Sequence, residues 1–255
     1  IFEILDDILP EVEPEIKSII KNELTKKSVE FYLKSRVKTA EKDYIVAEVN
    51  GQDERFEAPV LLVATGRKLN IDNIGLENIG VEFSSRGIKV DKYCRTNIPN
   101  VYAAGDVTGV SLLAHTAYRE AEVAVNNILG EKDIMRYEAI PSVIYTNPEI
   151  ASVGITEKQA KEMNIDYIST TLPMTYSGRF VAENEGKNGL IKVIAGKKFG
   201  EILGVHMVGN PSSEIIYGAA MDIEMKLRIK DLQQIVFPHP TVSEILKEIA
   251  FSFKY

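Results

Sequence analysis

The spacing of apolar residues along the first 60 positions predicts one helix followed by several strands. Isoleucines and a leucine recur three or four residues apart over 12–27, which is the period of a helix face. Asn50 and Gly51 indicate a hairpin, because both residue types tolerate positive φ. Short runs rich in β-branched and aromatic residues predict strands at 1–4, 29–33, 37–41 and 44–49.

Two later apolar runs predict short strands that end in glycine. The run 60–64 is apolar without interruption, as expected of a strand buried on both faces, and it ends at Gly66. The run 101–104 predicts a second buried strand, which ends in a Gly-Asp pair. A helix is expected over 113–129, where alanines line one face.

From residue 139 onward, strand signals alternate with helix signals. Helices are predicted at 156–163, 212–225 and 241–251. Strands are predicted at 142–145, 151–154, 167–174, 190–195 and 202–208. We expect an antiparallel sheet with helices on one face in this α+β region, within a chain of the α/β class overall. The segments are 1–67, 68–138 and 139–255.

Composition and charge narrow the possible functions. The chain has 255 residues, is 45% hydrophobic and 26% charged, and carries a formal net charge of −7. An acidic chain of this kind is not expected to bind nucleic acid or an anionic membrane. Its apolar runs are far shorter than the roughly 20 residues that span a bilayer.

Cysteine content and the first residues add two expectations. Cys94 is the only cysteine, which excludes an internal disulfide and a cysteine-type zinc site, so we expect no metal and a reducing, cytoplasmic setting. The chain is apolar from Ile1, whereas a natural N-terminus is usually polar and loosely held. We therefore expect the 255 residues to be the C-terminal part of a longer protein.

A histidine between two prolines is the main candidate for acid/base chemistry. His239 lies between Pro238 and Pro240, and Glu244 follows five residues later. A carboxylate hydrogen-bonded to one ring nitrogen fixes the tautomer of such a histidine. The run 241–244 also fits a capping box, in which Glu244 only closes the start of a helix. The pattern leaves the catalytic and the capping interpretations open.

Other candidate residues lie where a ligand could approach the backbone or a carboxylate. Asp106 follows a predicted strand, and the helix start at 112–115 offers free backbone N–H groups, although Asp106 could equally be an ordinary turn residue. Gly66 could let a ligand lie against the backbone or simply end a strand. Glu3 could bind a ribose at the end of a dinucleotide-fold strand, or could simply be a surface charge.

The order and spacing of five motifs resemble the C-terminal half of the flavin disulfide reductases, the pyridine nucleotide-disulfide oxidoreductases. Within that family the chain is most similar to the dihydrolipoamide dehydrogenases. The resemblance covers essentially the whole chain. The motifs are VLLVATGR (60–67), NIPNVYAAGDVTG (97–109), LLAH (112–115), VIYTNPEIASVG (143–154) and HPTVSE (239–244).

The resemblance implies two partial Rossmann-like domains, an interface domain and a set of site residues. Residues 1–67 would be the later part of an NAD domain, 68–138 the returning part of an FAD domain, and 139–255 the interface domain that forms a homodimer. His239 would be the acid/base and Glu244 would orient it. The implied FAD contacts are Asp106, Leu112, Leu113, Ala114 and His115, and the implied NAD contacts are Glu3, Val37 and Gly66.

The activity implied is oxidation of dihydrolipoamide by NAD through FAD and a redox disulfide that lies outside this chain. Lipoyl domains of 2-oxo-acid dehydrogenase complexes would be the partners. Thr116 departs from the lysine that the lipoamide enzymes usually have there. The alternatives are an NADP-dependent, glutathione reductase-like enzyme, which a carboxylate at Glu3 disfavours, and a dimerising fragment that is catalytically inert by itself.

Overall fold

The computed structural model describes residues 1–254, which fold as two compact units. Residues 1–63 and those from 141 onward form the first unit, and residues 64–140 form the second. The predicted segment 68–138 therefore falls inside the second unit, whereas 1–63 belongs with the C-terminal region. No helix among the described residues is long and apolar enough to cross a membrane.

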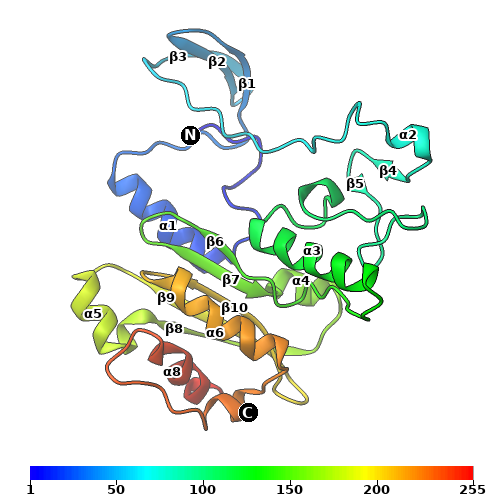
Figure 1. The fold of residues 1–255 in the computed structure, drawn as a ribbon. Helices are drawn as coiled ribbons and strands as arrows, with labels where there is room; N and C mark the ends of the chain where they lie inside the picture. Colours follow the sequence, from blue (N-terminus) through cyan, green and yellow to red (C-terminus); the bar gives the residue numbers. More distant parts are fainter. Residues whose placement is uncertain (255) are drawn as a thin grey trace. The chain divides into compact units, whose positions relative to one another are not determined.

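A five-stranded antiparallel sheet is the centre of the first unit (Figure 1). Alternate residues of its strands point to a core formed with α5 (Gly178–Asn184), α6 (Ser212–Glu224) and α8 (Glu244–Ser252). Short elements η2 (Met174–Tyr176) and α7 (Ile229–Leu232) complete this layer. The strands, in spatial order, are β6 (Ser142–Ile144), β7 (Ile150–Gly154), β10 (Ile202–Val208), β9 (Leu190–Gly196) and β8 (Tyr167–Pro173).

The expectation that helices cover only one face of this sheet is wrong. Helix α1 (Pro14–Lys26) packs Ile16 and Ile20 against Ile150 and Val208. The neighbours of those two strand residues, Ala151 and Met207, belong to the core on the other side. Because successive strand residues point to opposite faces, α1 must cover the second face. The apolar stripe predicted the helix itself but not the surface against which it packs.

The hairpin predicted at Asn50 and Gly51 is confirmed, because both residues have positive φ, of 51° and 80°. It joins β2 (Tyr44–Val49) to β3 (Gln52–Glu57), and β1 (Arg36–Ala40) pairs with β2 on the other side. The strands predicted at 1–4 and 29–33 do not form. A parallel bridge, Phe2 to Tyr32, and a bond from the Ile1 amine to the Glu30 carbonyl join these segments. Both rings pack with Phe56 at 4.7–4.8 Å between centroids.

The predicted doubly buried strand at 60–64 is also wrong. Val60, Leu62 and Val63 are 80%, 87% and 69% exposed, and the segment has no strand conformation. A strand becomes buried on both faces only when neighbouring strands and covering helices surround it. No strand among the described residues pairs with this segment, so its apolar composition alone cannot fix its conformation.

The second unit is built around helix α3 (Ala114–Ile128), which matches its predicted range within one residue at each end. Its other elements are α2 (Leu76–Ile79), β4 (Phe83–Ser84), β5 (Gly87–Ile88) and η1 (Asp106–Thr108). The predicted buried strand at 101–104 is reduced to one antiparallel bridge, Tyr102 to Arg95. Cys94 packs with Val123 of α3 in a small apolar cluster.

We expect Asp222→Asn to stabilise the protein at neutral pH. Asp222 of α6 is 7% exposed, and burial raises the pKa of its carboxyl to about 6. The folded protein thus binds this proton more tightly than the unfolded chain, whose carboxyl titrates near 3.9. Its contribution to the free energy of unfolding is present below about pH 4 and is lost as the pH rises through about 6.

Urea unfolding at pH 4.5 and 7 would test this. The asparagine variant should be more stable than the wild type by about 1–2 kcal/mol at pH 7. Its free energy of unfolding should also change less between the two pH values than that of the wild type. Asp166→Asn, at a carboxylate whose side chain is 77% exposed, is the control and should change the free energy of unfolding at pH 7 by less than about 0.5 kcal/mol. The same change in the free energy of unfolding with pH in the Asp222→Asn variant and in the wild type would contradict the prediction.

Candidate functional site

The histidine and glutamate singled out in the sequence lie in direct contact. His239 Nδ1 is 2.9 Å from Glu244 Oε1, and the His239–Pro240 peptide bond is cis. The imidazole is 80% exposed, whereas the carboxylate is only 20% exposed. One ring nitrogen is therefore held by the protein, and the rest of the ring is open to another molecule.

Glu244 binds the turn before α8 as well as the histidine. Its Oε2 accepts a hydrogen bond from the Thr241 backbone N–H at 2.8 Å. The capping box expected over 241–244 does not form, because α8 begins at Glu244, its N-cap is Ser243 without a side-chain bond, and the Thr241 hydroxyl donates to the Pro238 carbonyl at 2.8 Å. The backbone bond from Thr241, followed by the bond to His239, holds the pKa of the Glu244 carboxyl below its usual value.

These bonds also assign the tautomer of the imidazole. A carboxylate with a lowered pKa carries no proton at neutral pH, so Glu244 can only accept the bond from His239. Nδ1 must then carry the hydrogen, which leaves Nε2 with a lone pair. The exposed nitrogen is thus the one that can take a proton from a reactant.

An open cavity of about 570 Å³ lies beside this loop, between α5, α6 and α8. Its wall includes Pro240, Thr241 and Val242 of the histidine loop, and Phe237 and Leu246 give it an apolar floor. The residues that follow His239 therefore line a concave surface, while the His239 ring itself is exposed.

The predicted flavin contacts lie together in the second unit. Asp106 is the first residue of η1 and is 47% exposed, with Arg67 Nη1 at 3.6 Å from its Oδ2. Leu113 is the N-cap of α3, and Ala114 and His115 are exposed in its first turn. A carboxylate and a helix N-terminus are thus both accessible, as binding of a polyol chain and an electron-rich ring would require.

Thr116, which departs from the lysine of the lipoamide enzymes, has a structural role here. It is 1% exposed, and its hydroxyl shares a 2.8 Å hydrogen bond with the Ser111 hydroxyl. This bond fixes the residues immediately before α3. The substitution therefore replaces a long charged side chain by one that closes the preceding loop.

The predicted nucleotide contacts are divided between the units. Glu3 and Val37 lie in the first, and Gly66 lies in the second. The Ser35 N–H donates to the Glu3 carbonyl at 2.9 Å, which places Glu3 beside the start of β1. Val37 is 44% exposed, and Gly66, with φ of 105°, has open space where a side chain would lie. One Glu3 carboxylate oxygen accepts from the Leu5 N–H at 3.0 Å.

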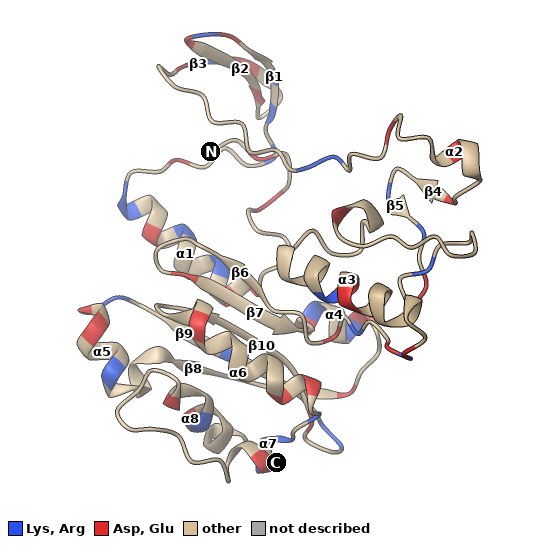
Figure 2. Cartoon of the chain, viewed as in Figure 1, with Lys and Arg blue, Asp and Glu red and all other residues tan. Residues whose placement is uncertain are grey.

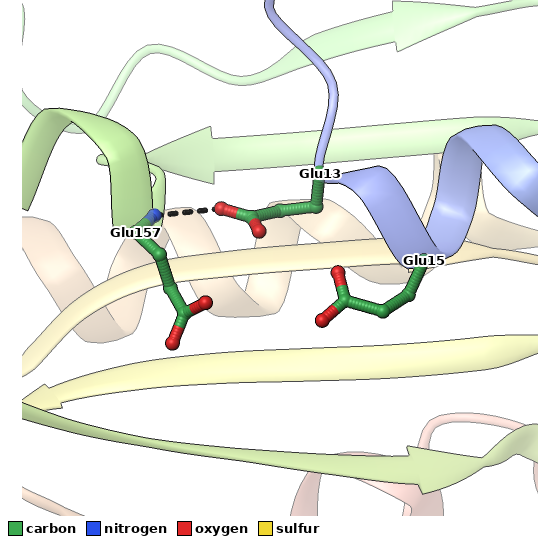
Figure 3. Close-up of side chains that lie close together, drawn as sticks. All are labelled: Glu13, Glu15 and Glu157. Carbon is green, nitrogen blue, oxygen red and sulfur yellow. Dashed lines mark hydrogen bonds between the residues drawn. The ribbon is translucent and has the colours of Figure 1, made fainter.

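A cluster of charges around a buried lysine was missed in the sequence. Glu13 at the N-cap of α1, Glu15 of α1 and Glu157 of α4 (Glu157–Glu162) lie close enough for their oxygens to hold a cation, and Glu15 is exposed (Figure 3). The Lys192 ammonium of β9 occupies their centre, at 2.7 Å from Glu13 and 2.9 Å from each of the other two. The cluster is therefore an ion-pair network, with the lysine where a metal would lie.

Lys192 keeps its charge although it is only 2% exposed. Burial lowers the pKa of its ammonium, but the hydrogen bonds to Glu13, Glu15 and Glu157 outweigh that effect and hold the pKa well above its usual value. A lone lysine inside the apolar strand 190–195 was the available sequence signal. Figure 2 shows lysines and arginines on helices, strands and loops. Among the described residues, Lys192 is the only lysine or arginine that is buried.

The single cysteine does not provide a reactive thiol. Cys94 is fully buried, and burial, followed by the charge of Glu120, raises the pKa of its thiol to about 11. The thiol therefore stays protonated at neutral pH, and a nucleophilic thiolate is disfavoured. Any dithiol chemistry at His239 has to use sulfur atoms from elsewhere.

Comparisons with known proteins match nearly the full length of the chain. Residues 1–121 match the family profile described as pyridine nucleotide-disulphide oxidoreductase. Residues 140–250 match the dimerisation domain of the same family. The chain is 37% identical over 251 residues to the dihydrolipoyl dehydrogenase of Bacillus subtilis, covering 96% of this chain and 53% of that protein. The Buchnera aphidicola dihydrolipoyl dehydrogenase is 39% identical over 243 residues, with coverage of 92% and 51%.

Solved structures agree on the fold. LpdA from Mycobacterium tuberculosis superposes with a TM-score of 0.90 at 23% identity, covering 98% of this chain and 55% of that one. The HOCl-induced flavoprotein disulfide reductase RclA from Escherichia coli gives 0.87 at 26% identity, with coverage of 99% and 59%. The chain thus spans about half the length of the relatives it matches.

Proposed function

Because the chain belongs to the pyridine nucleotide-disulphide oxidoreductases, we propose that it carries the C-terminal half of a flavin disulfide reductase that oxidises dihydrolipoamide with NAD. The observation that carries the proposal is the hydrogen-bonded pair of His239 and Glu244, with Nε2 of the imidazole free to act as a base. The dihydrolipoyl dehydrogenases among its relatives support the choice of substrate.

The residues present fit both cofactors of the proposed reaction. Asp106 offers an exposed carboxylate to ribityl hydroxyls, and the first turn of α3 at 112–115 offers backbone N–H groups to the flavin ring. Glu3 and Val37, both in the first unit, would border the adenosine ribose of NAD. When bound, FAD supplies the transfer of two electrons between a dithiol and the nicotinamide.

The protein's own contribution is to move and hold protons. His239 Nε2 removes a proton from a thiol of the dithiol substrate, and Glu244 stabilises the imidazolium that results. Glu244 is fixed by the Thr241 N–H, so the ring is held in one orientation. Since Cys94 is buried, we propose that the redox disulfide lies outside these 255 residues.

We further propose that the active protein is a homodimer that serves lipoyl domains of 2-oxo-acid dehydrogenase complexes. The match of residues 140–250 to a dimerisation domain supports the homodimer. The exposure of His239 supports a role toward a disulfide outside its own fold. In domain terms, 1–67 would contribute to an NAD domain, 68–138 to an FAD domain and 139–255 to the dimer interface.

Two other functions compete with this proposal. A glutathione reductase-like enzyme would use NADP, but a carboxylate at Glu3 would repel its 2′-phosphate. A dimerising polypeptide without cofactor would use the interface sheet alone, and the exposed apolar segment 60–63 is compatible with that function.

The test is to purify the longer protein that carries these residues together with the redox disulfide, and to measure its flavin absorbance and nicotinamide reduction. We expect a flavin band at about 450 nm and reduction of NAD when dihydrolipoamide is added. NADP should be a much poorer acceptor than NAD. Reduction of glutathione disulfide with NADPH would favour the first alternative. If that longer protein were colourless and without dehydrogenase activity, the enzymatic proposal would be overturned. The 255 residues alone are expected to dimerise without activity, because they lack the disulfide.

A further inference from the structure

A buried carboxylate beneath the proposed flavin loop has not been assigned a role. Glu120 of α3 is 0% exposed. Its Oε2 accepts a hydrogen bond from the Gly105 backbone N–H at 2.5 Å, and its Oε1 accepts one from the Tyr137 hydroxyl at 2.8 Å. Burying a carboxylate is costly unless hydrogen bonds satisfy it, so this site is built around those two donors.

The backbone of Gly105 is hydrogen-bonded on both sides of its Cα atom. While Glu120 accepts from its N–H, its carbonyl accepts from the Thr108 hydroxyl and the Thr108 N–H, each at 3.0 Å. Its φ of 83° and ψ of −161° are conformations that glycine adopts readily and other residues do not. A Cβ there would also come within 3.3 Å of the Ala117 side chain. The backbone is therefore fixed immediately before Asp106.

We propose that Glu120 is a positioning residue that holds Gly105 so that the Asp106 carboxylate points toward the ribityl hydroxyls of the flavin. Glu120 does not itself touch the flavin in this proposal. It acts through Gly105, and Tyr137 orients it from the other side. The inference rests on the proposed flavin-binding role of Asp106.

The helix that carries Glu120 gives this arrangement a second consequence. The first turn of α3 at 112–115 is the proposed contact for the flavin ring, and Glu120 lies further along the same helix. One rigid helix thus positions the ring contacts directly and the ribityl contact through Glu120. The two parts of the flavin site keep a fixed spacing as long as the bond from Glu120 to Gly105 is intact.

The experiment compares three variants of the protein by FAD titration and by NMR of protein labelled with ¹⁵N-glycine. Glu120→Leu removes both acceptors. Glu120→Gln retains one acceptor for Gly105 and can donate to Tyr137, so it is the conservative rescue. Glu122→Gln, on an exposed part of the same helix, is the matched control.

We expect Glu120→Leu to weaken FAD binding by about 10-fold or more, from the usual size of a hydrogen bond to a charged group. Glu120→Gln should recover most of this loss, and Glu122→Gln should bind like the wild type. The Gly105 amide should be shifted downfield and protected from exchange in the wild type, and both features should disappear in Glu120→Leu.

Several results would overturn the inference. These are wild-type FAD affinity in a folded Glu120→Leu variant, or a Gly105 amide that exchanges freely in the wild type. If Glu120→Leu does not fold, the Gly105 amide decides the matter: its shift and protection should be present in the wild type and reduced in Glu120→Gln, and an unchanged amide in Glu120→Gln would overturn the inference. If the wild type binds no FAD, the proposed flavin function fails, and the Gly105 amide alone decides whether Glu120 positions the loop.

Discussion

Replacing His239 with glutamine is expected to reduce dihydrolipoamide oxidation by about 10²-fold or more, which is the usual size of general acid–base effects. Glutamine keeps a polar side chain of similar reach but has no nitrogen that can take up a proton. The imidazole is 80% exposed, so the folded state should lose little when it is replaced. The measurement is the steady-state rate of NAD reduction by the flavin-loaded enzyme, with unfolding followed in parallel.

Glu244→Gln separates the two functions of the glutamate. The amide oxygen can still accept from the Thr241 N–H, but the negative charge beside His239 is gone. Activity should fall, while the start of α8 is retained. Gln234→Ala, at an exposed residue outside the pair, should leave the rate unchanged. Activity within a few-fold of wild type in His239→Gln would leave Glu244 only its structural bond to the Thr241 N–H.

Replacing Lys192 with methionine should lower the free energy of unfolding by about 3–5 kcal/mol. The side chains of Lys192 and Glu13 are each only 2% exposed, so removing the ammonium leaves a buried carboxylate without its counter-charge. Methionine matches the length of the lysine stem, so lost packing contributes little. Urea unfolding followed by circular dichroism measures the difference.

A second lysine at the end of the same strand is the matched control. Lys197 forms a 3.6 Å ion pair with Asp166, and these side chains are 61% and 77% exposed. Lys197→Met should therefore change stability by less than about 0.5 kcal/mol. Adding Glu13→Gln to Lys192→Met should recover part of the loss, because it removes the unpaired charge. Equal effects of the two lysine substitutions would show that the ion pairs of Lys192 add no more to the free energy of unfolding than the exposed ion pair of Lys197.

Helices and turns that depend on nearby residues could be predicted from the sequence. The helices at 14–26 and 114–128 and the hairpin at Asn50 and Gly51 depend on local periodicity and turn chemistry, and all three form. The segment 60–63 was mispredicted because a buried strand depends on neighbours that local pattern does not reveal. Helix α1 was predicted, but its place on the second face of the sheet was not.

The candidate site shows the same division. His239 and Glu244 are five residues apart, so their contact follows from the local turn and the helix start. Lys192 and Glu13 are 179 residues apart, and nothing in the local sequence around either residue specifies the other. Glu120 could have been suspected as an acid on the alanine-lined face of α3, but its bond to Gly105 depends on how the loop folds back. The functional roles of all these residues remain predictions.

The packing of α1 against the five-stranded sheet affects how the chain folds during synthesis. Ile16 and Ile20 emerge from the ribosome long before Val208 of β10, against which they pack. At roughly 5–20 residues per second, this delay amounts to roughly 10–40 s. Residues 64–140 can form their own compact unit in that interval, while the apolar stripe of α1 stays uncovered. A chaperone that covers the apolar face of α1 during this interval would therefore protect the nascent chain from aggregation.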